Sequence, residues 1–470
     1  MSLIFKRYYK YLLFTFFLFL IFAFLFLLSP LYSLAFVLFL TFLLIFFDKP
    51  EISLYIIIFS IVFGQLVRLP LGTSEGTGAI ILSDVFVPAA FIFFLARKFL
   101  KRLDYRWQGV DTALTIFLVL STLSLLLGSR YLPAGEILTA SFYLIRLIAY
   151  VGLFFICKDL AKDNISFAKN VVYCLIAVSF LLAITGVLQY FIFPSMQILA
   201  QRGGWDPHFK RAFASFLDPN FLGSFLSFGV ALTLSLYFYS KKSKERTYLL
   251  LIAAVLILAL FLTYSRTAYI ALFISFVVIT AIHSKKILFW GVLILTLVFV
   301  LNPQAMQKLK DTFNQKKSGY MRLVNWKRGW ETAKTNLYTG VGYNAIGYYQ
   351  KEVYRFYKKG SESHSITGSD SSFLFLLATT GFFGLLSFLL VLFLFLQKSF
   401  RLFQSASSPP LFRALALALF SILLSAIVAF QFINGFFYPH LMIFIYIVAG
   451  IIFSLNSHDK IKKEGIKNQA

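Results

Sequence analysis

The sequence predicts an all-α polytopic integral membrane protein with about 12–14 transmembrane helices and one large, partly helical exterior loop. Of its 470 residues, 59% are hydrophobic and only 13% are charged, whereas about 25% of the residues in a soluble domain are charged. Apolar runs long enough to cross a bilayer, about 20 residues, recur along the chain. Lys and Arg total 44 against 19 Asp and Glu, a net charge of +25. These observations exclude a soluble domain, a disordered chain and a disulfide scaffold.

The apolar runs define the elements in order. The first, residues 11–28, is not a cleavable signal peptide, because no small-residue cleavage site follows it and a second run begins at once. The first two runs could also form one re-entrant unit. The narrowest separation is at 263–267, where only Ser-Arg-Thr divides two runs. The fourteen predicted spans are 11–28, 31–47, 52–67, 80–96, 112–127, 139–156, 170–191, 218–240, 248–263, 266–282, 286–301, 371–397, 411–431 and 436–456.

The distribution of cations predicts the orientation. With the N-terminus in the cytoplasm, 25 of the 44 Lys and Arg residues fall on the cytoplasmic side, as the positive-inside rule requires. Fourteen spans also place the C-terminus inside. We therefore expect helices 1–11 in residues 1–301, the large exterior loop in 302–370, helices 12–14 in 371–457 and a basic cytoplasmic tail in 458–470.

The exterior loop 302–370 carries twelve Lys and Arg residues against five Asp and Glu residues. Long loops cross the membrane regardless of charge, so this excess of cations does not require a function. The alternative is that the loop faces an anionic ligand or anionic lipid headgroups.

One helix is predicted within this loop. Leu323, Trp326, Trp330, Ala333 and Leu337 follow 3-4-3-4 spacing and form one apolar stripe. A short helix with Trp on one face and cations on the other suits a membrane interface. Packing of the stripe on top of the helical bundle is equally consistent with the sequence.

Soluble-enzyme motifs are missing from the sequence. It has no phosphate-binding Gly-Lys-Ser/Thr loop, no His-Glu-x-x-His and no paired-cysteine metal site. Cys157 and Cys174 are interpreted as small apolar residues near helix ends. Gly72–Gly78 is glycine-rich but lacks a lysine, and is interpreted as a flexible loop. We therefore expect neither cofactor nor metal.

Four polar clusters lie at the predicted outer membrane boundary. The first runs from Arg211 to Asn220, the second contains Arg266, the third contains Arg322, and the fourth contains Asp370. Structural alternatives exist for three of them. Asp218 and Pro219 suit a helix N-terminus, Arg266 could snorkel, and Asp370 could cap the twelfth span.

Arg146 is a fifth unusual residue, since it lies inside the sixth predicted span. A cation in a membrane helix needs a partner or a function. Asp84 and Glu136 are both candidate partners on the outer side.

Several arginines and one carboxylate on one face suit chemistry on a diphosphate leaving group. Guanidinium groups match phosphate oxygens bidentately and stabilise the charge of a departing diphosphate. A carboxylate can accept the proton of an attacking hydroxyl. Because ATP is not expected outside the cytoplasm, the substrate should carry its own activated bond, as a lipid-diphosphate sugar does.

The four clusters resemble, in order, motifs of the O-antigen ligase and polymerase family of bacterial envelope enzymes. Arg211-x-Phe-x-Ser-Phe-x-Asp-Pro-Asn220 resembles the segment before a central helix, and Leu262-Thr-Tyr-Ser-Arg266 resembles a Thr-x-Ser-Arg signature. Arg322 with Trp326, then Gly340-Val-Gly342, resembles the family's large periplasmic loop. The last of the ligase motifs is a His followed by a polar residue, nine further residues and then Gly-x-x-Gly. Here Asp370 stands at the position of that His, with Gly381 and Gly384 at the family spacing.

This resemblance implies the roles of individual residues. Arg211 and Arg266 would hold the diphosphate, and Arg322 would help position it. Asp370 would act on the acceptor hydroxyl, although its unperturbed pKa, about 3.9 against about 6.5 for His, makes it a weaker base. His364 could substitute for the missing His. The further substrate-binding residues expected are Arg202, Arg328 and Asn220.

The resemblance also implies a membrane glycosyltransferase in the bacterial inner membrane with a periplasmic active face. It would move a glycan from undecaprenyl diphosphate to a glycan or lipid A-core acceptor, in lipopolysaccharide biosynthesis, by an inverting reaction without metal or nucleotide. No nucleic acid partner is expected. The missing His shifts weight from ligase toward polymerase.

Two other functions are compatible with the sequence. One is a transporter or flippase for lipid-linked oligosaccharide, since ionisable intramembrane residues are typical of transporters. The other is a metal-dependent enzyme that uses Glu75 and Asp84.

Overall fold

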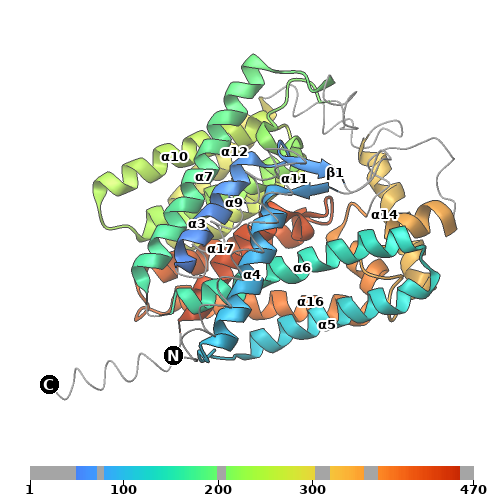
Figure 1. Ribbon diagram of the computed structural model, residues 1–470. Coiled ribbons are helices and arrows are strands. Elements are labelled where there is room, and N and C mark those ends of the chain that lie inside the picture. The colour runs from blue at the N-terminus through green and yellow to red at the C-terminus, as the bar shows by residue number, and fades with distance from the viewer. Residues whose placement is uncertain are drawn as a thin grey trace, which may run out of the picture.

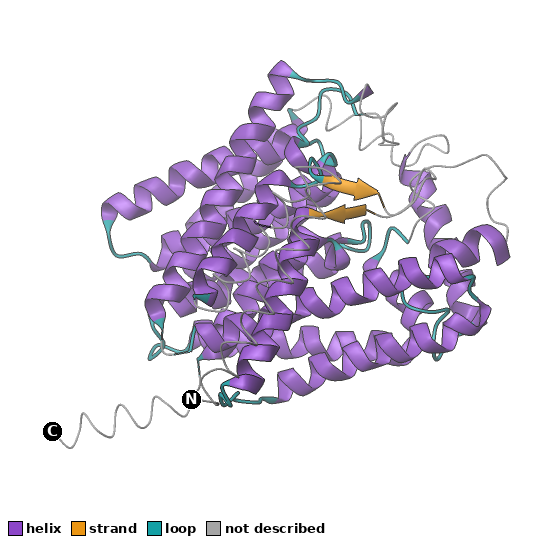
Figure 2. Ribbon diagram, in the orientation of Figure 1, coloured by secondary structure: helices purple, strands orange, loops and turns teal. Residues whose placement is uncertain are grey.

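The chain folds into a bundle of long helices. The computed structural model describes residues 37, 49–70, 79–162, 164–197, 208–301, 318–353 and 369–455. Within these residues there are fourteen α-helices and one short antiparallel pair of strands (Figures 1 and 2). The all-α fold class predicted from the sequence is confirmed. The predicted spans 11–28 and 31–47 lie outside the described residues, apart from Val37.

The described elements follow the predicted spans closely. In the first half of the chain they are α3 (Pro50–Ser60), η1 (Ile61–Phe63), β1 (Arg68–Pro70), β2 (Ala79–Ile81), α4 (Leu82–Leu100), α5 (Gly109–Gly128), η2 (Ser129–Tyr131), α6 (Ala134–Leu160), α7 (Ile165–Ile192) and η3 (Ala214–Phe216). In the second half they are α9 (Pro219–Tyr239), α10 (Ser243–Leu262), α11 (Arg266–His283), α12 (Lys285–Val300), α14 (Ser318–Thr335), α15 (Ile346–Tyr348), η5 (Tyr349–Val353), α16 (Ser372–Gln404), α17 (Pro410–Ala429), η7 (Gly435–Phe437) and α18 (Pro439–Ser454).

Eight of the described helices are long and apolar enough to cross a membrane: α5 with η2, α6, α7, α9, α10, α11, α16 and α17. Two further apolar helices, α3 with η1 and α18, are shorter. The narrow separation at 263–267 divides two helices, as predicted, because α10 ends at Leu262 and α11 begins at Arg266. Tyr264 reverses the chain between them with a left-handed φ of 49°.

α9 forms the centre of one half of the bundle. It packs against α7, α10, α11 and α17, and nearly all of its side chains from Leu222 to Leu236 are buried. Its hydroxyl groups bond back to its own backbone; for example, Thr233 Oγ1 donates to the Gly229 carbonyl at 2.7 Å. Such local bonds satisfy polar atoms where no water is present.

α16 is broken at Gly381, whose φ of 71° is left-handed. The break leaves carbonyl groups of the preceding turn without helical partners, and two backbone amides donate to them. Val341 N donates to the Ala378 carbonyl at 2.9 Å, and Gly342 N donates to the Thr379 carbonyl at 3.1 Å. A Cβ on Gly340 would lie 2.2 Å from the Thr379 oxygen. The two glycine motifs therefore fit against each other, and they fix the segment after α14 on α16.

The two ends of the bundle carry different elements. Figure 1 shows the β1–β2 hairpin and α14 at the same end, which also holds the N-termini of α9 and α11; we call it the outer end. The connections α9–α10, α11–α12 and α16–α17 lie at the opposite end. The candidate site is at the outer end.

Candidate functional site

The segment before α9 is anchored to its neighbours by backbone and amide bonds. Ala212 N donates to the Leu262 carbonyl at 2.8 Å. Gln189, at the end of α7, accepts from Phe213 N at 2.8 Å, and its Nε2 donates to the Arg211 carbonyl at 3.3 Å. Arg211 is thereby fixed between the end of α7 and the turn that joins α10 to α11.

The Arg211 side chain is held by neutral acceptors. Its Nε donates to the Thr263 carbonyl at 2.8 Å, and its Nη2 donates to Asn220 Oδ1 at 3.4 Å. His208 Nδ1 lies 3.5 Å from Nη1. No carboxylate of the described residues forms an ion pair with Arg211, so its positive charge is oriented but not neutralised by contact.

The N-termini of α9 and α11 meet beside Arg211. Asp218 caps α9 by accepting from the amides of Asn220 and Phe221, so the capping interpretation of Asp218 and Pro219 is confirmed. Ser265 caps α11 and donates its hydroxyl to Asn220 Oδ1 at 3.0 Å. Asn220 thus links both N-termini to Arg211. Helix N-termini favour anions, whereas Arg266 places a cation in the first turn of α11.

α14 brings a third arginine and the fourth cluster together. Asn325, on α14, is only 4% exposed, and its Nδ2 donates to Asp370 Oδ2 at 2.9 Å. Asn325 Oδ1 is buried without a donor. Trp326 Nε1 donates to the Gln431 carbonyl at 2.9 Å, and Gln431 Oε1 accepts from Ser371 at 3.2 Å. These bonds hold α14 against the start of α16.

Asp370 is not the cap of α16, contrary to the structural alternative for this residue. Ser371 is the N-cap, and its hydroxyl accepts from Leu374 N. The carboxylate of Asp370 is half-buried and directed to Asn325. Capping therefore gives no reason for an acidic residue at this position.

Electrostatics connect the clusters across the outer end. The pKa of Arg211 is lowered to about 10, mainly by burial and also by Arg322 and Arg266, while Asp218 acts in the opposite direction. Burial also lowers the pKa of Arg322, against the charges of Asp370 and Asp218. These shifts indicate that Arg266 and Arg322 lie within electrostatic range of Arg211, and we call these three residues the arginine cluster.

Left-handed backbone angles concentrate in the same loops. Of the six non-glycine residues with positive φ in the described part of the chain, four lie in the segment before α9 or in the turn between α10 and α11: Lys210, Ala214, Leu217 and Tyr264. Each such residue costs about 1–3 kcal/mol, and such strain clusters at functional sites.

The predicted apolar stripe of α14 is divided between its surface and its packed face. Leu323 and Trp330 are 57% and 44% exposed and Leu337 lies beyond the end of the helix, whereas Ala333 of the stripe is buried together with Asn325 and Thr332. The helix packs on α16 through small and polar residues and leaves most of the stripe on the surface. Of the two interpretations, this favours the membrane interface.

Arg146 lies apart from the arginine cluster and is fully engaged. Its Nε donates to Asp84 Oδ1 at 2.7 Å, its Nη2 contacts Asp84 Oδ2, and Nη2 also donates to the Ala79 carbonyl at 2.7 Å. Tyr150 donates to the same carboxylate. Asp84, not Glu136, is therefore the partner. Glu75 lies outside the described residues. Because Asp84 is bound to Arg146, the suggested metal site of Glu75 and Asp84 loses one ligand.

The remaining predicted site residues are placed only in part. Arg328 is half-buried on α14. Arg202 and His364 lie outside the described residues, as do 302–317 and 354–368 of the exterior loop. Sequence analysis missed Gln189, Asn325 and Gln431. The only signal for Asn325 was an amide three residues after Arg322 in the same short helix.

Residues 251–389 match the family described as O-antigen ligase. The match begins within α10 and ends within α16, so it includes Arg266, Arg322 and Asp370, while Arg211 and Asn220 precede it. No curated protein is significantly similar to the chain. The family match supports the resemblance to O-antigen ligases and polymerases that the four motifs indicate.

Proposed function

We propose that this chain, which carries an O-antigen ligase domain at residues 251–389, transfers a glycan from undecaprenyl diphosphate to a sugar hydroxyl. The domain and the membrane-crossing helices support a membrane enzyme that transfers glycans. The donor, the acceptor and the mechanism are our proposal. The observation that carries it is the arginine cluster at the outer end, in which Arg211 is held by neutral acceptors, within electrostatic range of the half-buried carboxylate of Asp370.

The arginine cluster is proposed to bind the donor diphosphate. Arg211 is oriented by the Thr263 carbonyl and Asn220, so its guanidinium does not reorganise when the anion arrives. Two helix N-termini add positive potential at the same place. When the bond between the anomeric carbon and the diphosphate breaks, the leaving oxygen keeps the electron pair, and Arg211, Arg266 and Arg322 stabilise its charge.

Asp370 is proposed to accept the proton of the acceptor hydroxyl. The hydroxyl oxygen attacks the anomeric carbon from the side opposite the diphosphate, which inverts the configuration. Inverting glycoside hydrolases use a carboxylate as base in the equivalent step, so the change from His to Asp is chemically acceptable. Asn325 orients the carboxylate through the bond to Oδ2, and Arg322 lies within electrostatic range of it. Arg328, Arg202 and His364 are proposed to contact the substrates.

The membrane placement is also proposed. The distribution of Lys and Arg puts both termini in the cytoplasm of a multi-pass inner-membrane protein and the outer end in the periplasm. Exposed Leu323 and Trp330 on α14 suit the boundary between membrane and water, where a lipid-linked donor presents its diphosphate.

The transporter alternative loses its main support. It relied on Arg146 as an intramembrane charge, and Arg146 is neutralised by Asp84 in a buried pair. Arg211, which is oriented without an ion pair to any carboxylate of the described residues, lies at one end of the bundle rather than at its midplane.

The test is transfer by purified protein given lipid-diphosphate oligosaccharide, with and without lipid A-core, and analysed on a gel. A ladder with the donor alone indicates a polymerase, and a shift that needs the core indicates a ligase. Asp370→Ala should abolish either product while the protein still inserts. If liposomes show flipping of the donor with no change in glycan length, the proposal is wrong.

A further inference from the structure

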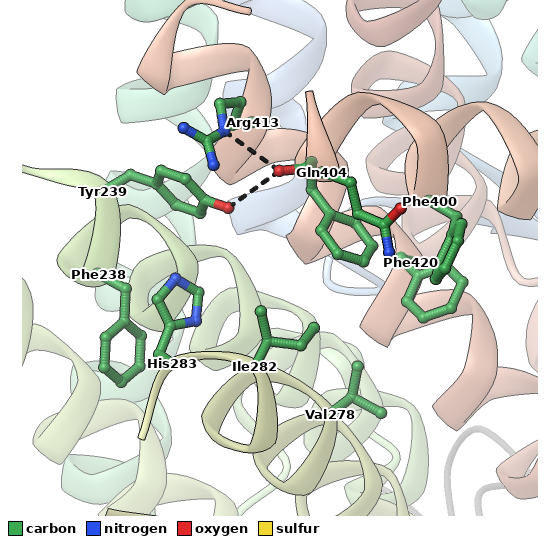
Figure 3. Close-up of a pocket in the computed structure, with 10 residues that line it drawn as sticks. Phe238, Tyr239, Val278, Ile282, His283, Phe400, Gln404, Arg413 and Phe420 are labelled. Atoms are coloured by element: carbon green, nitrogen blue, oxygen red, sulfur yellow. Dashed lines mark hydrogen bonds between the residues drawn. The ribbon is translucent and has the colours of Figure 1, made fainter. Parts of the chain in front are cut away.

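A cavity lies at the end of the bundle opposite the arginine cluster. It has a volume of about 660 Å³ and is formed by the last turns of α9, α11 and α16 with the first turns of α17 (Figure 3). α9 and α11 begin at the outer end, so the cavity and the candidate site are separated by about 30 Å, the length of a 20-residue helix. The cavity therefore does not belong to the proposed transfer site.

One side of the cavity is polar and cationic. The Phe403 carbonyl accepts from Arg413 Nε at 3.2 Å and from the Tyr239 hydroxyl at 3.4 Å (Figure 3). The Arg413 guanidinium also lies 5.0 Å from the centre of the Tyr239 ring. No carboxylate of the described residues pairs with Arg413. Its guanidinium is thus fixed at the cavity wall with its charge available to an anion.

The other side of the cavity is apolar and reaches the surface of the bundle. It is lined by Val278, Ile282, Phe400 and Phe420. Ile282 and Phe400 are 46% and 44% exposed. In a membrane protein that surface faces acyl chains, so the cavity passes from a cationic end at the helix termini to an apolar end that opens toward lipid.

The connections around the cavity are strongly basic. Residues 240–246, 284–286 and 398–413 hold nine Lys and Arg residues and one acid, Glu245. Glu245 is already engaged by Tyr173 and by Ser240, which donates to it at 2.8 Å. The local field therefore attracts anions to the mouth of the cavity.

We propose that this cavity binds an anionic phospholipid, with the headgroup phosphate on Arg413 and one acyl chain along Val278, Ile282 and Phe400. A free phosphate would use Arg413 but leave the apolar wall uncovered, so the amphipathic lining favours a lipid. A zwitterionic lipid brings an ammonium group into a region that already has nine cations. With the proposed orientation the lipid belongs to the cytoplasmic leaflet, and the site does not depend on the transfer reaction.

Native mass spectrometry of the full chain in neutral detergent tests this, with dioleoyl phosphatidylglycerol and dioleoyl phosphatidylcholine as probes. Wild type should retain one phosphatidylglycerol molecule in preference to phosphatidylcholine. Arg413→Gln should weaken its retention by about tenfold, the effect of one charged hydrogen bond. Arg401→Gln is the matched control, because Arg401 is exposed on α16 at the same end but does not line the cavity.

A second variant keeps the test decisive if Arg413→Gln does not fold. Val278→Phe fills the apolar part and should reduce retention while Arg413 stays in place. Equal retention of both lipids would overturn the proposal, as would equal losses in Arg413→Gln and Arg401→Gln. Displacement of the lipid by millimolar inorganic phosphate would show a simple anion site and would also overturn it.

Discussion

Arg146 is buried and Arg211 is half-buried, and their charges have different partners. Two nitrogens of Arg146 contact the Asp84 carboxylate, and its Nη2 also donates to the Ala79 carbonyl. Tyr150 donates to the same carboxylate. Arg211 meets carbonyl and amide oxygens instead, with Arg266 and Arg322 in electrostatic range. The first arrangement neutralises a charge within the molecule. The second orients a charge and leaves it for a partner that the protein does not contain.

The partners of a cation separate structural from functional cations in a membrane protein. A cation that a carboxylate neutralises fixes one helix against another, as Lys158 does with Asp111 between α6 and α5. A cation held by neutral oxygens among other cations is unfavourable until an anion binds. Removal of the paired Arg146 should therefore lower stability, whereas removal of Arg211 should lower activity without lowering stability.

The largest expected effect is on stability at the paired arginine. Arg146→Met leaves Asp84 buried and unpaired, which costs about 3–5 kcal/mol. The double change Arg146→Met with Asp84→Leu should recover most of that loss, because no charge is then left without a partner. The measurement is the unfolding midpoint in detergent. An equally unstable double variant would show that Arg146 does more than pair with Asp84.

The second effect is on activity at the arginine cluster. Arg211→Gln should reduce glycan transfer by about 10²–10³-fold, the loss typical of removing one preorganised donor to a developing anion. The unfolding midpoint should stay the same or rise, because a cation beside other cations is removed. Arg130→Gln is the control, since Arg130 is an exposed arginine in the η2 turn. Wild-type transfer by Arg211→Gln would remove the arginine cluster from the reaction.

A smaller effect is expected at Asn325, which positions Asp370 without taking the proton. Asn325→Ala should reduce kcat by about 10–100-fold, corresponding to a hydrogen bond to a charged group, with little change in KM for the donor. The pH profile of kcat should shift, because the carboxylate loses a bond that stabilises its ionised form. An unchanged pH profile with lower stability would make Asn325 merely structural.

The smallest effect concerns pH. The pKa of Arg211 is about 10 in the folded protein, against 12.5 ordinarily, so between these values the unfolded chain holds more protons. The unliganded protein should gain stability as pH rises through that window, and the cost of the buried cation should be complete below it. Affinity for inorganic pyrophosphate should instead fall as pH rises through about 10. Titration calorimetry checks this, and an affinity that is constant over the same range contradicts it.

The sequence predicted the positions of the long helices well because their signal is local. Runs of apolar residues set where α10 ends and α11 begins, and the triplet between them marked the turn. It could not predict which face of α14 is packed, because helices in membranes pack through small residues rather than the most apolar ones. Trp330 lies on α14 as predicted and is exposed, Leu337 lies beyond the end of the helix, and Gly329 of α14 approaches Leu374 of α16.

The candidate site was predictable in its residue types but not in its connections. Arg211, Arg266, Arg322 and Asp370 could be selected because each stands in a short polar cluster that resembles a family motif. The bond from Asn325 to Asp370 joins positions 45 residues apart, and the fit of Gly340 against the Gly381 break joins two loops. Such contacts depend on tertiary packing, which no spacing in one sequence encodes.

The most direct test of the central claim is the thermal shift caused by inorganic pyrophosphate in wild type, Arg211→Gln and Arg130→Gln. A ligand that binds only the folded protein raises its stability by RT ln(1 + [L]/Kd). The account predicts a concentration-dependent rise of Tm in wild type and in Arg130→Gln, and none in Arg211→Gln. Equal shifts in all three proteins, or no shift in wild type, would contradict it.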